Sequence, residues 1–271
     1  EYFGAIEGAS LEANKGAYSY AWMIIFAVIA AIMVLIGLYH IRMLPSNQIP
    51  STTKKTTSEV GRELVAVIAN FFTKKHIFYY ICFIILYRLA EGFIMKIAPL
   101  FLRASREVGG LGLSLKEIGT LNGVFGSAAF VLGSLLAGIY VSKFGLKRTL
   151  FTLCCIFNLP FVAYTFLAVT QPTNVYLIGT CITMEYFGYG FGFVGLTLFM
   201  MQQIAPGKHQ MSHYAFASGI MNLGVMLPGM VSGYFSDLLG YRNFFIYVLI
   251  ATIPAFLITY FIPFTYDDSK K

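Results

Sequence analysis

Charged residues are scarce in this chain. They make up 11% of its 271 residues, whereas hydrophobic residues make up 58%. Soluble domains carry about 25% charged residues, so this composition excludes an ordinary soluble protein. The apolar residues form long runs, and about 20 consecutive apolar residues are enough to cross a bilayer as a helix. The composition therefore predicts an all-α integral membrane protein.

Sequence motifs for catalysis and metal binding are also missing. The chain has no Walker A loop, no G-x-S-x-G motif and no HExxH pair, which are the usual signatures of ATP-driven pumps, serine hydrolases and zinc proteases. We therefore expect neither an enzyme nor an ATP-driven pump, and we expect no metal or cofactor. The cysteines all lie inside apolar runs without metal-ligand spacing; they are Cys82, Cys154, Cys155 and Cys181.

Seven segments are long and apolar enough to be membrane spans. A polar stretch rich in Pro, Ser, Thr and Lys separates the first from the other six and predicts a linker. Within it, residues 61–72 are typical of an amphipathic helix on the membrane surface. We expect an outer loop and one helix over 1–40, a cytoplasmic linker over 41–76 and a six-helix bundle over 77–271. The predicted spans are 20–39, 77–99, 119–141, 149–169, 175–201, 214–235 and 244–264.

Basic residues are distributed unevenly between the two predicted sides of the membrane. If the linker is cytoplasmic, the cytoplasmic segments hold 12 Lys and Arg residues and the outer segments hold 5. This excess obeys the positive-inside rule. The formal net charge of +7 therefore indicates topology, and nucleic acid is not an expected partner.

The second predicted span carries Arg88 and Glu91 near its middle. A charge at this depth costs roughly 3 kcal/mol or more, so it normally faces a protein interior or a water cavity with a partner. Positions three apart are neighbours on one helix face. We interpret this face as lining a polar path through the protein; a structural ion pair that locks two helices is the alternative.

Other polar groups are predicted at membrane depth. Glu185 precedes a glycine-rich run and has no basic residue nearby in the sequence, which suits either a proton carrier or a neutral hydrogen-bonding acid. Asn122 and Asn222 are candidates to line a cavity or to join helices by hydrogen bonds. Tyr87, Tyr186 and Tyr189 are candidates for stacking against a sugar ring, although such tyrosines are also ordinary in helical bundles.

Small residues recur at four-residue spacing in several spans, a pattern that lets helix backbones approach closely in lipid. Prolines inside the spans favour kinks, because each removes a backbone hydrogen bond; they are Pro160, Pro228 and Pro254. The small-residue sets are 119/123, 129/133/137, 188/192 and 229/233.

The cytoplasmic turn after the third span reads GIYVSKFGLKRT over 138–149. It resembles the G-x-x-x-D-x-x-G-x-K/R-K/R signature of the major facilitator superfamily. Gly138, Gly145, Lys147 and Arg148 occupy signature positions, and Ser142 stands where the signature has Asp. The resemblance implies a gating turn that helps to set the inward or outward state.

A second match, GYFSDLLGYRNFF over 233–245, contains Asp237 and Gly240. Together with YRLAE at 87–91 and the acid at 185, it resembles the AmpG-type muropeptide permeases, over roughly residues 79–264. The resemblance implies that the chain is helix 6, the central linker and helices 7–12 of a major facilitator transporter. The N-terminal helical bundle of that protein would be missing from this chain.

The resemblance implies a secondary transporter of the cytoplasmic (inner) membrane that imports muropeptides or related saccharides with protons by alternating access. Arg88 would contact an anion or sugar, and Glu91 and Glu185 would accept protons. The expected partners are this substrate, protons, the lipid bilayer and the N-terminal bundle. A transporter of a simple sugar, peptide or drug is the close alternative, and a non-transporting membrane sensor or receptor is the alternative from another class.

Overall fold

The computed structural model describes residues 12, 14–43 and 56–266. The predicted linker residues 44–55 lie outside these ranges. The chain divides into two compact units, Glu1–Thr56 and Thr57–Lys271. The described part of each unit is helical and contains no strand, which confirms the predicted all-α class.

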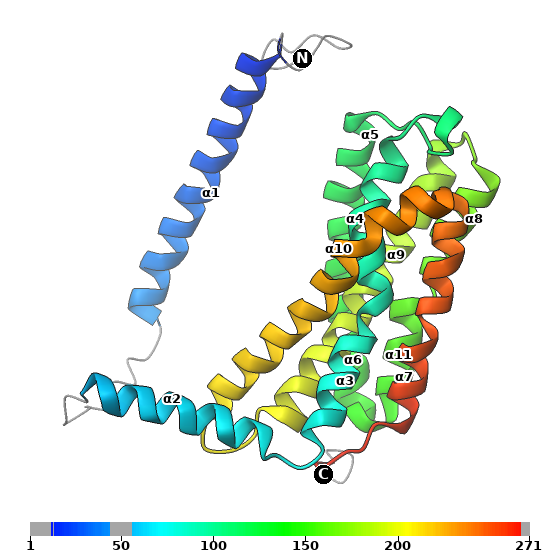
Figure 1. The fold of residues 1–271 in the computed structure, drawn as a ribbon. Coiled ribbons are helices and arrows are strands. Elements are labelled where there is room, and N and C mark those ends of the chain that lie inside the picture. Colours follow the sequence, from blue (N-terminus) through cyan, green and yellow to red (C-terminus); the bar gives the residue numbers. More distant parts are fainter. Residues whose placement is uncertain (1–11, 13, 44–55, 267–271) are drawn as a thin grey trace. The chain divides into compact units, whose positions relative to one another are not determined.

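The first unit contains α1 (Lys15–Met43), which is shown in Figure 1. This helix includes the predicted span 20–39, and its most apolar window has a mean hydropathy of 2.8. Its 29 residues extend about 43 Å at 1.5 Å per residue, more than the roughly 30 Å of a hydrocarbon core. A helix that is apolar on all sides is suited to lipid.

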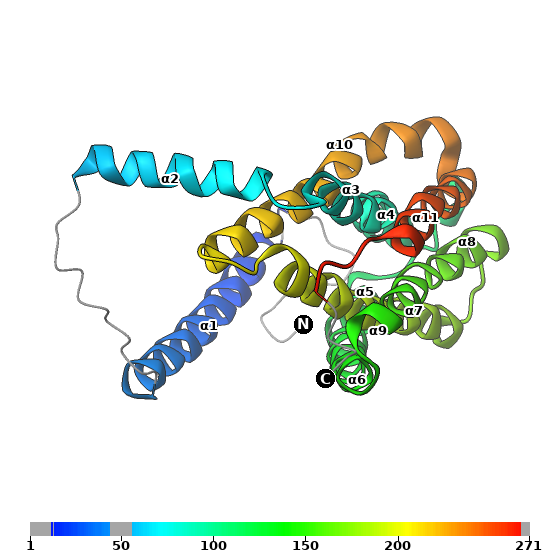
Figure 2. The same ribbon diagram turned by 90° about the horizontal axis from the view of Figure 1, so that it is seen from below.

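The second unit is a helical bundle preceded by one amphipathic helix, α2 (Figure 1). Figure 2 views most of the bundle helices close to end-on. Short turns connect most of them, but the most extensive packing joins helices that lie far apart in the sequence. The helical elements are α2 (Thr57–Phe72), α3 (Ile77–Tyr87), α4 (Leu89–Arg103), η1 (Arg106–Val108), α5 (Leu115–Thr120), η2 (Leu121–Gly126), α6 (Ser127–Phe144), α7 (Leu146–Asn158), α8 (Phe161–Thr170), α9 (Val175–Phe199), η3 (Met200–Ile204), α10 (Gln210–Ala251) and α11 (Ile253–Phe261).

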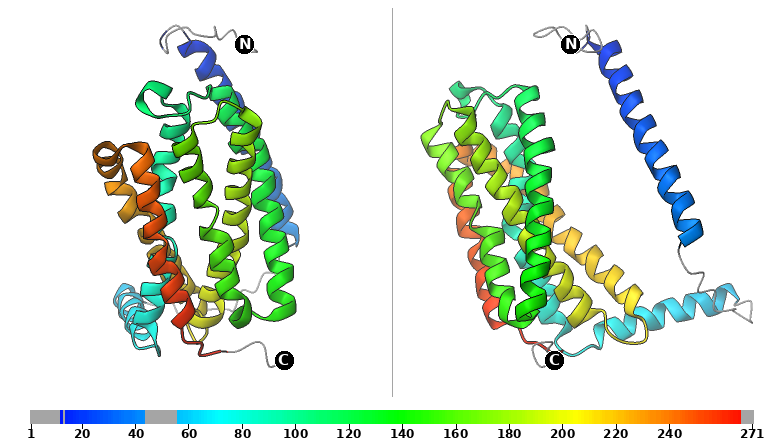
Figure 3. Two further views of the ribbon diagram at one scale, coloured as in Figure 1. Left: turned by 90° about the vertical axis from the view of Figure 1, so that its right-hand side faces the viewer. Right: turned by 180° about the vertical axis from the view of Figure 1, so that it is seen from behind.

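Five helices of the described chain are long and apolar enough to cross a membrane. The last of them, Gln210–Phe261, has 52 residues and reverses direction at Gly240, whose φ of 69° and ψ of 160° are not helical. Helix α9 is less apolar and is not among the five, but it packs against α6 and α7 (Figure 3). Every predicted span thus falls on a helix. The five are Lys15–Met43, Ile77–Arg103, Leu115–Phe144, Leu146–Thr170 and Gln210–Phe261.

Several spans are interrupted inside the bundle. The helix breaks at Arg88, between α3 and α4, and again at Leu159 and Pro160, between α7 and α8. Pro254 lies in the first turn of α11, whereas Pro228 stays inside the continuous helix α10. The elements η2 and η3 are π-helical turns, a form that often marks functional sites.

The close contacts of α9 depend on glycine. A Cβ atom on Gly190 would collide with the carbonyl oxygen of Phe130 in α6, and one on Gly192 would collide with the side chain of Phe157 in α7. Gly123 in η2, by contrast, has no such neighbour within 4 Å. The predicted small-residue faces on α6 and α9 therefore serve packing within the bundle, while the face at 119/123 stays open.

The C-terminal end of α2 docks on the bundle. Phe71 is 1% exposed, and its ring lies 5.7 Å from that of Phe216 in α10, centroid to centroid. Lys74, just after the helix, donates hydrogen bonds from Nζ to the carbonyl oxygens of Ile204 and of Pro206, the latter at 2.8 Å. These carbonyl groups lie at the C-terminal end of the α9–η3 helix, where the helix dipole favours a positive charge. Burial lowers the pKa of Lys74 from its usual value.

Candidate functional site

Arg88 and Glu91 form a buried, bidentate ion pair in the middle of the second span. Arg88 Nε donates to Glu91 Oε2 at 2.6 Å, and Arg88 Nη2 donates to Oε1 at 2.5 Å. Their side chains are only 5% and 7% exposed. The guanidinium also lies 5.4 Å from the centre of the Phe193 ring, within cation–π range. Each charge is thus compensated where water is scarce.

The broken helix places this pair. Arg88 ends α3 with φ −103° and ψ 7°, and Glu91 lies in the first turn of α4, where the helix dipole favours an acid. Gly92 lets α4 approach α10 closely, because a Cβ there would collide with the ring of Pro228 and come within 2.7 Å of the Val225 carbonyl oxygen.

Glu91 also borders a cavity of about 100 Å³ that Glu185 and Asn122 line from α9 and η2. Asn122 Oδ1 is buried and has no hydrogen-bond partner in the described chain. Glu185 likewise has no hydrogen-bond or ion-pair partner within 56–266. The other lining residues are Ile94, Met95, Ala98, Pro99, Leu102, Tyr164, Tyr186 and Tyr189.

The size and chemistry of this cavity suit water and protons. At about 30 Å³ per molecule, its volume holds about three waters. Such waters would satisfy Asn122 and bridge the two carboxylates, since a buried water typically makes about three hydrogen bonds. A sugar-sized ligand needs about 300 Å³ or more, so only its edge could be bound here.

Two residues predicted for this site lie elsewhere. Tyr87 is fully buried, and its hydroxyl donates to the carbonyl oxygen of Gly192 at 2.9 Å, so it joins α3 to α9. Asn222 lies on an exposed face of α10 and does not line the cavity. The structure thus brings Arg88, Glu91, Glu185 and Asn122 together without these two.

The structure adds a tyrosine that the sequence did not single out. Tyr164 reaches the cavity from α8, and no sequence signal links it to Glu91. The sequence candidates Tyr186 and Tyr189 both line the cavity, and Tyr189 follows Glu185 by four positions on the same helix face. Lys96 lies on α4 one residue after the lining residue Met95, and its side chain is exposed.

The predicted gating turn has a defined geometry. Gly145 separates α6 from α7 with φ 76° and ψ 149°, a left-handed conformation that favours glycine. With Gly138 and Arg148 it borders a cavity of about 540 Å³, while Lys147 is exposed. The second match lies at the opposite end of the bundle, where Gly240 turns the chain (Figure 1), three residues after the exposed Asp237.

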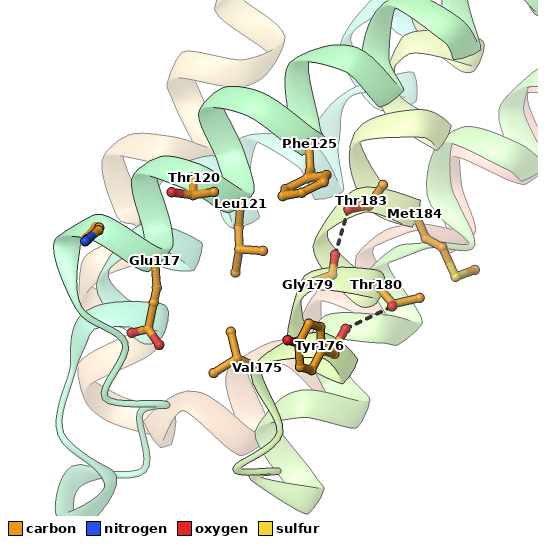
Figure 4. A pocket seen from close by; sticks show the side chains of 11 residues that line it. Glu117, Thr120, Leu121, Phe125, Val175, Tyr176, Gly179, Thr180, Thr183 and Met184 are labelled. Carbon is orange, nitrogen blue, oxygen red and sulfur yellow. Dashed lines mark hydrogen bonds between the residues drawn. The ribbon is translucent and has the colours of Figure 1, made fainter.

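Figure 4 shows a separate groove of about 560 Å³ between α5–η2 and the start of α9. Leu121, Phe125 and Met184 line it. The hydroxyls of Thr180 and Thr183 donate to carbonyl oxygens one turn earlier in α9. This groove therefore offers mainly apolar surface, and none of the predicted site residues lines it.

The chain is similar to proteins that are named as permeases or transporters. No protein-family model matches it. The anhydromuropeptide permease of Escherichia coli K12 is 23% identical over 209 residues, 77% of this chain and 41% of that protein. Putative transporter AmpG 1 of Rickettsia bellii is 25% identical over 86% of this chain and 56% of its own length. Putative transporter AmpG 2 of Rickettsia prowazekii is 27% identical over 73% of this chain and 47% of its own length.

The chain spans about half the length of the curated relatives it matches. The predicted resemblance to AmpG-type permeases is confirmed over most of the chain. Together with the five helices that are long and apolar enough to cross a membrane, this resemblance supports a multi-pass protein of the cytoplasmic membrane.

Proposed function

We propose that this chain forms the C-terminal part of a proton-coupled secondary transporter that imports an anhydromuropeptide or related saccharide. A second helical bundle would supply the other side of the pathway, and the two bundles would rock around a site near the membrane midplane. The relatives named as anhydromuropeptide permease and AmpG transporter support this substrate class.

The observation that carries the proposal is the meeting of Glu91 and Glu185 on one small cavity within the predicted membrane spans. A structural ion pair alone would need only Arg88 and Glu91. The further acid, Glu185, has no partner in the described part of the bundle, and ionisable groups inside membranes mark ion and substrate paths.

The geometry suggests how a proton would act. Glu91 is held by Arg88, so Glu185 is the carboxylate that is free to take up a proton. When both are ionised they repel each other across the cavity. Protonation of Glu185 removes that repulsion and would bias the bundle toward one state.

One proton per substrate supplies enough energy for accumulation. Moving one charge down a 100 mV potential releases about 2.3 kcal/mol. At 1.4 kcal/mol per factor of ten, this supports a gradient of about 50-fold.

The test is uptake of labelled anhydromuropeptide by the full-length protein in proteoliposomes with an imposed proton gradient. We expect Glu185→Gln to abolish gradient-driven accumulation, because the amide cannot carry a proton, while exchange without a gradient persists. Glu91→Gln should also lose uptake, when uptake is normalised to the amount of folded protein. Glu107→Gln, at an exposed position in η1, is the matched control and should behave as wild type.

Gradient-driven accumulation by both Glu185→Gln and Glu91→Gln at the wild-type level would remove the proton role. Competition by unlabelled simple sugars or dipeptides, with none by unlabelled anhydromuropeptide, would change the substrate class and leave the transport mechanism in place.

A further inference from the structure

Lys96 is a cation within the second span that has no ion-pair partner in the described bundle. The span Ile77–Arg103 has 27 residues and is about 40 Å long at 1.5 Å per residue, so about 5 Å at each end lies outside a 30 Å hydrocarbon core. Lys96 stands seven residues before Arg103, about 10 Å from that end. Its Cα therefore lies inside the core.

The side chain of Lys96 does not point to the nearer membrane surface. Side chains on a helix tilt toward its N-terminus, and α4 begins near the membrane centre at Leu89. The stem of Lys96 packs sideways on α10: Cγ and Cε lie 3.4 and 3.7 Å from where a Cβ of Gly229 would stand. The absent side chain at 229 thus leaves room for the lysine.

The exposed surface around Lys96 continues into the cavity described above. Met95 and Pro99 are exposed neighbours on α4 and also line the cavity of Glu91 and Glu185. A charge on such a surface requires water or a polar partner rather than lipid. This face of α4 is therefore the rim of the polar path.

Arg88, the residue first expected to bind an anion, is already neutralised. It makes two hydrogen bonds to Glu91 and stacks on Phe193, and it is 4% exposed. Lys96 has neither an ion-pair partner nor such a ring contact in the described bundle. The cation available to a ligand is thus Lys96.

We infer that Lys96 binds a carboxylate of the transported molecule at the rim of the polar path. This inference rests on the proposed transport function, since it assigns a specificity-determining contact to the same site. The ammonium supplies up to three donors on a flexible stem, which suits an acid group whose position shifts as the bundles rock.

The test is equilibrium binding to the purified full-length protein in nanodiscs. The two probes are anhydromuropeptide with free carboxylates and the same compound with its carboxylates converted to methyl amides. We expect the wild-type protein to bind the acid probe about tenfold more tightly than the amide. Lys96→Gln should weaken binding of the acid probe about tenfold and leave the amide unchanged, while Lys96→Arg should stay close to wild type. Lys96→Met, which keeps the stem, replaces Lys96→Gln if that variant does not fold.

The results separate this inference from the proposed function. If Lys96→Gln weakens the binding of both probes equally, the inference is overturned, because that result indicates that Lys96 pairs with an acidic side chain elsewhere in the protein. Unchanged binding of both would overturn it as well. If Lys96→Gln weakens binding of the acid probe alone, and the protein shows no gradient-driven uptake, the inference is supported and the transport mechanism is contradicted. A wild-type protein that binds neither probe would overturn both.

Discussion

At the residue scale, the pairing of Arg88 with Glu91 follows from their spacing, since positions three apart share a helix face. The proximity of this pair to Glu185 could not be predicted from spacing, because Glu185 lies on α9 and no local pattern aligns two distant helices. Lys96 was visible in the sequence, but the amphipathic pattern of α4 does not show whether its exposed side faces lipid or a polar surface. The pairing of charges close in the sequence could thus be predicted, whereas the contact between residues of different helices could not.

The buried ion pair gives a prediction about stability. Removing one partner leaves an uncompensated charge, so Arg88→Gln should lower the free energy of unfolding by about 3–5 kcal/mol. The double variant Arg88→Gln/Glu91→Gln should lose less than this single variant, because both charges are gone. Unfolding in mixed micelles measures all the terms of the double-mutant cycle.

Additive losses in that cycle would contradict the pair as an energetic unit. They would indicate that Arg88 is stabilised mainly by Phe193, which lies 5.4 Å from its guanidinium.

At the scale of elements, long apolar runs predicted where the helices lie, and prolines predicted two of the interruptions, at Pro160 and Pro254. The break at Arg88 and the π-helical turns at η2 and η3 were not predictable. They depend on side chains packing from other helices rather than on a local helix breaker. The site lies at two of these interruptions, Arg88 and η2.

The predicted amphipathic helix at 61–72 is observed as part of α2; its contact with the membrane surface remains a prediction. We expect Lys74→Ala to loosen the end of α2, because three carbonyl oxygens at the end of η3 lose their donor. A loss of about 1 kcal/mol corresponds to roughly fivefold faster hydrogen exchange in the last turns of α2.

The neighbouring Lys75 is the control for this prediction, since it is exposed and makes no such bonds in the described structure. Lys75→Ala should leave exchange unchanged. Equal acceleration by both substitutions would show that overall positive charge, rather than the Lys74 contacts, holds the helix.

At the scale of the whole molecule, the two glycine turns are related. Positions 138, 142 and 145 correspond to 233, 237 and 240, each 95 residues later, and Gly145 and Gly240 share nearly the same φ and ψ. The turns lie at opposite ends of the bundle (Figure 1). Glu91 and Glu185 are 94 residues apart, so they stand at nearly corresponding places before the two turns.

The two carboxylates line one cavity from α4 and α9. Alternation of the predicted spans from a cytoplasmic linker already put the first motif on the cytoplasmic side and the second, which follows the sixth span, on the outer side. The domain boundaries predicted from composition, at 40 and 76, remain predictions, as do the roles of Asn222 and of the gating residues.

The central claim is that the face of α4 carrying Met95 and Lys96 meets an aqueous, substrate-accessible path. The most direct measurement is the labelling of Met95→Cys by a membrane-impermeant thiol reagent, in the full-length protein with its native cysteines replaced. Leu257→Cys, exposed on the apolar surface of α11, is the lipid-facing control. We predict rapid labelling at position 95, slowed by anhydromuropeptide, and negligible labelling at position 257. Labelling at position 95 that is no faster than at position 257 would place this face against lipid and contradict the account.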